Sequence, residues 1–143
     1  PGAAERMGEI IHETGAQWFT LNGPDRALYH LACVVASNHL VTLYHVAQTL
    51  LSRATGTADV PPEALRSLME ASVENLRRED PARALSGPAQ RGDTSAISHH
   101  IDALDHLAPE YMSLYSELLR AGFPLLPKNS QEKLTELLNG PRS

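Results

Sequence analysis

The feature that most constrains the fold is a long stretch without formal charge. From Ala27 to Ser52 the chain carries no Asp, Glu, Lys or Arg, and its pattern is helical from Pro24 to Thr55. Pro24 suits the first turn of a helix and Gly56 suits its end. Helices exposed to water carry charged residues on one face. We therefore expect this helix of about thirty residues to be largely enclosed by protein.

A membrane-spanning helix is the main alternative for this stretch. Five of its side chains are polar and costly to place in hydrocarbon: His30, Asn38, His39, His45 and Gln48. We therefore expect no membrane partner.

The remaining hydrophobic periodicity predicts five more helices. They are expected over Ala3 to Glu13, Pro61 to Arg78, Asp93 or Thr94 to His106, Pro109 to Arg120, and Asn129 to Gly140. Trp18 to Leu21 is typical of a short strand or an extended arm. Asn129 and Glu132 resemble a capping box at the start of the last helix. The expected fold is all-α, with about six helices around one long central helix in a single domain, residues 1–143.

Composition narrows the class of protein. The chain has 143 residues, 42% hydrophobic and 20% charged, which is ordinary for one globular domain. A net charge of −5 and the lack of a basic cluster argue against a nucleic-acid partner. The one cysteine, Cys33, lies in the apolar helical stretch, so we expect a buried thiol and a cytoplasmic location. Residues 1–14 lack the hydrophobic segment of a signal peptide.

Polar side chains form a stripe on one face of the long helix. At 100° per residue they fall within an arc of about 120°, and they are His30, Ser37, Asn38, His45, Gln48 and Thr49. A polar face without charge suits a substrate cleft or a subunit interface, because burying an unpaired charge is costly. The alternative is that these groups bind backbone carbonyls and water.

The loop from Leu85 to Thr94 is the second candidate for a site. Gly87 and Gly92 permit unusual backbone conformations, and Asp93 or Thr94 leads into a helix whose free N–H groups favour an anion. Arg91 could grip a carboxylate or phosphate. The alternative is a structural loop in which Arg91 pairs with Asp93 or with a helix terminus.

Three residues on the helix predicted from Asp93 or Thr94 to His106 have the spacing of metal ligands. His99, Asp102 and His106 fall at i, i+3 and i+7, which could present them to zinc. No fourth ligand is evident, so we expect a solvated face and no metal. A metal-binding helical protein stays as a third hypothesis.

Two stretches carry a family resemblance: "RALYHLACVVASNHL", residues 26–40, and "LSGPAQRGDTSAI", residues 85–97. Together they resemble the helical C-terminal domain of Rossmann-like oxidoreductases. That domain is classed largely as one of unknown function and is similar to the C-terminal halves of 6-phosphogluconate dehydrogenase and pyrroline-5-carboxylate reductase. The resemblance spans roughly residues 9–119.

The resemblance implies a division of labour. An N-terminal Rossmann domain, absent from this chain, would bind NADP or NAD, and the helical domain would supply the dimer contact and one wall of the substrate cleft. His30 and Asn38 would be catalytic. Substrate would be bound by Ser37, Ser86, Gly87, Arg91, Gly92, Asp93 and Thr94. The lysine that hydroxyacid dehydrogenases place one turn before this asparagine is replaced by Val34.

We therefore expect the substrate-side and dimerisation domain of an NAD(P)-dependent oxidoreductase. It would form a homodimer, accept a small anionic substrate, and be inactive alone. His30 would serve as acid or base, because the pKa of histidine lies near neutrality. The alternative is a non-catalytic helical interaction module.

Overall fold

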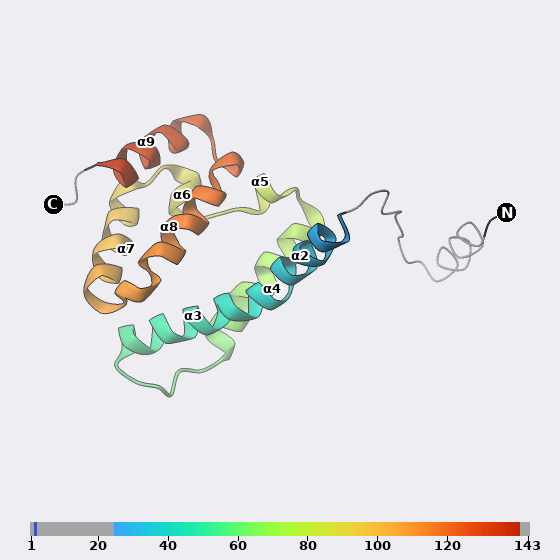
Figure 1. The fold of residues 1–143 in the computed structure, drawn as a ribbon. Helices are drawn as coiled ribbons and strands as arrows, with labels where there is room; N and C mark the ends of the chain where they lie inside the picture. Colours follow the sequence, from blue (N-terminus) through green and yellow to red (C-terminus); the bar gives the residue numbers. More distant parts are fainter. Residues whose placement is uncertain (1, 3–24, 141–143) are drawn as a thin grey trace. The chain divides into compact units, whose positions relative to one another are not determined.

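The computed structural model describes residue 2 and residues 25–140, and all secondary structure within them is helical (Figure 1). The chain forms two compact units, Pro1–Val41 and Thr42–Ser143, which are described separately below. The predicted helix from Ala3 to Glu13 and the segment from Trp18 to Leu21 lie outside the described residues.

The first unit contains α2, Arg26–Ala36, and the start of α3, Asn38–Thr55. The prediction of one uninterrupted helix is wrong at Ser37, whose φ of −120° and ψ of −69° leave the helical region. The backbone hydrogen bonds continue across it, since Ser37 N donates to the Cys33 carbonyl and Val41 N donates to the Ser37 carbonyl. The predicted polar stripe, which assumed a constant 100° step, therefore changes register at this residue.

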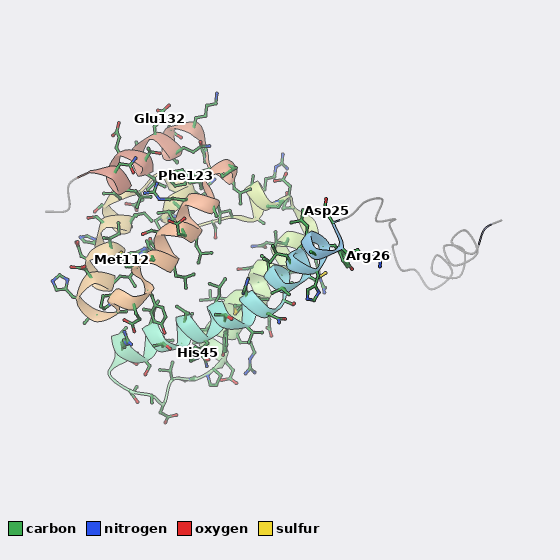
Figure 2. All side chains as sticks on the ribbon, viewed as in Figure 1. Asp25, Arg26, His45, Met112, Phe123 and Glu132 are labelled. Carbon is green, nitrogen blue, oxygen red and sulfur yellow. The ribbon has the colours of Figure 1, made fainter. Side chains whose placement is uncertain are left out.

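The described residues of α2 and α3 do not show the enclosure expected for the long helix. Neither α2 nor α3 has a buried residue, and Cys33 is exposed, so its assignment to the core is wrong. The side chains of α2, which begins at Arg26, are drawn in Figure 2. Several large hydrophobic residues of the first unit are exposed: Leu28, Tyr29, Leu31, Val35, Leu40 and Val41.

The second unit continues α3 and adds the other helices. They are α4 (Glu63–Arg78), α5 (Pro81–Ala84), α6 (Pro88–Arg91), α7 (Thr94–Leu107), the 3₁₀ helix η1 (Pro109–Tyr111), α8 (Met112–Ala121), the 3₁₀ helix η2 (Phe123–Leu125) and α9 (Lys128–Asn139). The predicted end of α3 is confirmed, because Gly56 follows Thr55 with a φ of +69°.

The core of the second unit lies where α7, the end of η2 and α9 meet. Ile97, Leu126 and Leu134 are almost fully buried, and Tyr115, Leu119 and Phe123 pack against them. In Figure 1, α7, α8 and α9 lie beside one another around this core. The helical periodicity of residues 61–78 predicts that Leu68, Val73 and Leu76 lie on an inner face of α4. All three are exposed instead.

Two short helices and one cap differ from the sequence prediction. Pro81 opens α5 after the break at Glu79 and Asp80, and Pro88 opens α6 inside the predicted loop. The capping box expected at Asn129 is also wrong. α9 begins at Lys128, and the Asn129 side chain accepts a hydrogen bond from Ser130 N.

Candidate functional site

The first group of predicted site residues lies at the junction of α2 and α3. The Ser37 hydroxyl is 2.6 Å from the Cys33 carbonyl and 3.1 Å from Asn38 Oδ1. Its single proton can serve one of these acceptors at a time. The bond to the carbonyl four residues earlier is a local contact common where serine bends a helix. Ser37 therefore binds the Asn38 amide only when its proton is directed at Asn38 Oδ1 rather than at the Cys33 carbonyl. His30 is exposed on α2.

The second group lies in the loop from Ser86 to Thr94, which the structure builds from two glycines and one turn of helix. Gly87, at φ +100°, precedes Pro88, and Gly92, at φ +63°, ends α6. Asp93 then caps α7, accepting a hydrogen bond from Ala96 N at 3.1 Å. The Asp93 carboxylate therefore occupies the helix N-terminus at which an anion was expected.

The loop is fixed by its packing against α9. Ser130, which is 1% exposed, donates a hydrogen bond from its hydroxyl to the Gln90 carbonyl at 3.1 Å. A Cβ atom on Gly92 would meet the same serine. Gly92 and Asp93 thus have structural functions in this loop.

Arg91 does not form the pair with Asp93 that the structural interpretation of this loop predicted. Its side chain is exposed and forms no ion pair with any residue between 25 and 140, so it does not pair with Asp93. Ser86 is exposed, and Thr94 begins α7. The guanidinium of Arg91 is consequently open to an anion from solution.

The two groups belong to different units. His30, Ser37 and Asn38 lie in the first unit, and residues 86–94 lie in the second. That they line one cleft stays a prediction, as do their individual catalytic and substrate-binding roles.

One of the three possible metal ligands on α7, His106, has another contact. His106 Nδ1 lies 2.7 Å from the Asp102 carbonyl, so this histidine interacts with its own helix. His100 Nδ1 lies 3.0 Å from the Tyr115 hydroxyl. No group of three His, Cys, Asp or Glu residues within the described part of the chain could hold a metal ion.

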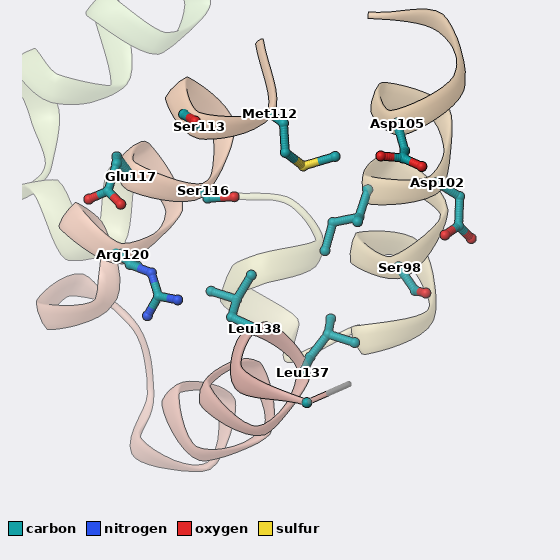
Figure 3. Close-up of a pocket in the computed structure, with 12 residues that line it drawn as sticks. Ser98, Asp102, Asp105, Met112, Ser113, Ser116, Glu117, Arg120, Leu137 and Leu138 are labelled. Carbon is teal, nitrogen blue, oxygen red and sulfur yellow. The ribbon is translucent and has the colours of Figure 1, made fainter. Parts of the chain in front are cut away.

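A polar pocket of about 370 Å³ lies between α7, α8 and the end of α9 (Figure 3). It contains the carboxylates of Asp102, Asp105 and Glu117 and the guanidinium of Arg120, whose Nη2 donates to Asn139 Oδ1 at 3.4 Å. Sequence reasoning missed this pocket, because its residues come from three helices. The polar spacing of Ser113, Ser116, Glu117 and Arg120 on α8 was the available signal.

Arg53 links α3 to the segment after α7. Its Nη1 donates to the Leu107 carbonyl at 2.8 Å, its Nη2 pairs with Glu110 Oε1, and its guanidinium carbon lies 5.9 Å from the centre of the Tyr111 ring. The hydrogen bond from Arg53 lowers the pKa of Glu110, and the same bond raises the pKa of Arg53. Sequence reasoning missed this pair, whose members are far apart in the chain.

One helical stretch among the described residues, Arg26–Thr55, is long and apolar enough to cross a membrane by length and composition alone. A single helical stretch of this kind is weak support for a membrane span.

One family model matches the sequence over most of its length. The domain of unknown function DUF2520 matches residues 1–121, most of the 143. The chain belongs to the DUF2520 family. No curated protein matches it, and no solved structure does. The DUF2520 match ends at Ala121, the last residue of α8, so the loop of residues 86–94 lies inside it. α9, which packs on that loop, lies beyond the matched residues.

Proposed function

We propose that this DUF2520 chain is the substrate-side and dimerisation domain of an NAD(P)-dependent oxidoreductase. The resemblance of residues 26–40 and 85–97 to 6-phosphogluconate dehydrogenase C-terminal-like domains supports the assignment, and both stretches lie inside the DUF2520 match. The observation that supports dimerisation is the exposed apolar surface of α2. This helix has no charged residue after Arg26, no buried residue, and Leu28, Leu31 and Val35 more than half exposed. A second copy would cover this surface.

The described residues do not themselves fit a dinucleotide. A Rossmann site needs a strand, a glycine-rich turn and a helix that starts at the pyrophosphate. Residues 25–140 form no strand, and the sequence has no GxGxxG. We therefore assign NADP or NAD to a Rossmann domain elsewhere in the full-length protein. The functions proposed for this chain are substrate binding and proton transfer.

Within that assignment each candidate residue has a separate function. His30 exchanges a proton with the substrate, and Ser37 orients the Asn38 amide through the hydrogen bond between them. Arg91 binds the anionic group of a small substrate, consistent with its exposure and its lack of a described ion pair. A non-catalytic interaction module is the second candidate, and the exposed apolar surface of α2 supports it equally.

Light scattering on the purified chain tests the dimer. We expect the mass of two chains, and we expect Leu31→Glu to give monomers, because the substitution places charge on the apolar surface of α2. Leu118→Glu, at a similarly exposed leucine on α8, is the matched control and should remain dimeric. A monomeric wild-type chain would contradict the dimerisation role.

Substitution of His30 separates the two candidate functions. In the full-length protein, His30→Ala should lower NAD(P)H-dependent turnover by about 10²-fold or more, while His39→Ala, at a neighbouring exposed histidine, should not. Unchanged turnover of the His30→Ala dimer would favour the interaction module.

A further inference from the structure

An apolar pocket of about 330 Å³ lies within the second unit, between α3, α7 and α8. Its walls are Leu50 and Ala54 of α3, Ala103 and Leu104 of α7, and Ala108. The volume is at the lower end of the range for small-molecule sites, roughly 300–1,000 Å³. The three alanines create the space, because larger side chains at those positions would fill it.

The charged group at the edge of this pocket is already neutralised. Arg53 lies beside it, and its guanidinium is occupied by the Glu110 carboxylate, the Leu107 carbonyl and the Tyr111 ring. An ionic ligand would have to compete with these contacts and lose its hydration in an apolar site. The charge distribution therefore selects a neutral ligand.

One polar pair remains in the pocket wall. The Tyr115 hydroxyl lies 3.0 Å from His100 Nδ1, and the two rings meet edge to face, 6.0 Å apart and 82° between planes. Burial raises the pKa of Tyr115, so its hydroxyl keeps the proton at neutral pH. Depending on the tautomer of His100, this hydroxyl can donate a further hydrogen bond or accept one.

We propose that this pocket binds a small, neutral aromatic molecule that carries one hydroxyl group. A rigid aromatic ring fits the apolar walls, and it loses less conformational entropy on binding than a flexible chain. The hydroxyl of the ligand bonds to the Tyr115 hydroxyl. The pocket lies in the second unit alone and does not depend on the proposed oxidoreductase function.

Calorimetric titration with p-cresol and with toluene tests the site, because these probes differ only in the hydroxyl. We expect both to bind the intact chain, p-cresol about fivefold more tightly, which is the net contribution of one hydrogen bond. Tyr115→Phe should remove that preference while leaving toluene binding unchanged. Ala103→Trp should abolish binding of both, and Ala71→Trp, the same change at an exposed alanine on α4, should not alter it.

Three binding results would overturn the proposal: no saturable binding of either probe, full binding by Ala103→Trp, or an undiminished p-cresol preference in Tyr115→Phe. If circular dichroism shows that Ala103→Trp does not fold, Ala54→Phe fills the pocket from α3 and gives the same comparison. Light scattering tests whether a second copy of the chain, rather than a small molecule, occupies the pocket. If Ala103→Trp instead converts a dimer to monomers, a second copy covers the pocket and the ligand site is refuted.

Discussion

A Cβ atom on Gly92 would lie 2.9 Å from the hydroxyl oxygen of Ser130 and 3.2 Å from its Cα. The close approach brings a loop inside the DUF2520 match against a helix outside it. Ser130 also donates a hydrogen bond to the Gln90 carbonyl. The same serine therefore constrains both where the loop of residues 86–94 lies on α9 and which backbone conformation it adopts. Position 92 must leave room for Ser130 and must also adopt a φ of +63°. Only glycine, which has no side chain, meets both requirements.

The first prediction concerns Gly92→Ala. We expect it to lower the free energy of unfolding by about 2–4 kcal/mol, combining backbone strain with the clash against Ser130. Gly56→Ala is the control, because Gly56 has a similar φ of +69° and nothing within 4 Å of its Cβ position. It should cost only the strain, about 1–2 kcal/mol. Urea denaturation measures both, and equal losses would show that Ser130 does not constrain the loop.

The second prediction concerns the cap of α7. Asp93→Ala should lower the free energy of unfolding by about 1 kcal/mol, because it removes the acceptor for Ala96 N. Asp93→Asn keeps an acceptor and should cost less. Asp80→Ala removes the equivalent cap from the four-residue helix α5 and should have a smaller effect. Thermal unfolding of the three variants checks this order, and a cost for Asn as large as that for Ala would contradict it.

The third prediction concerns the core. Leu134 is 0% exposed, so Leu134→Ala should destabilise the second unit by about 2–5 kcal/mol through lost burial and a residual cavity. Leu118, 46% exposed on α8, is the matched control, and its substitution by Ala should cost less than about 1 kcal/mol. Equal losses at the two sites in chemical denaturation would place the core elsewhere.

The fourth prediction concerns pH. The hydrogen bond from Arg53 lowers the pKa of Glu110 below its ordinary value of 4.5. A carboxyl whose pKa is depressed by folding stabilises the protein above the unfolded pKa, and this stability is lost as the pH falls through the folded pKa. Glu110→Gln should therefore lower Tm at pH 7 and reduce the fall in Tm between about pH 5 and pH 3.

The control for this pH effect is Glu136→Gln, at an exposed glutamate on α9. It should leave the acid limb of the Tm profile close to that of the wild type. Added salt should shrink the difference between wild type and Glu110→Gln at pH 7, because both partners of the pair are partly exposed. An acid limb in Glu110→Gln identical to that of the wild type would refute the role of this pair.

The sequence alone determined the helical class and several helix boundaries, because those signals are local. The predicted start of α7 at Asp93 or Thr94 is confirmed by the cap, and Gly140 follows the end of α9 as expected. The end of α4 at Arg78 is also confirmed. Each depends on a residue that acts on its own backbone within about one turn.

Tertiary structure decided which surfaces are buried and which residues meet. Hydrophobic periodicity identified an apolar face on α4, but not that Leu68 would remain exposed. Nothing near Gly92 in the sequence indicates Ser130, and nothing near Arg53 indicates Glu110. Contacts between residues so far apart in the chain follow from how whole helices pack, and local preferences for φ and ψ do not encode that packing. The sequence therefore named the candidate residues, and only packing showed which of them have structural functions.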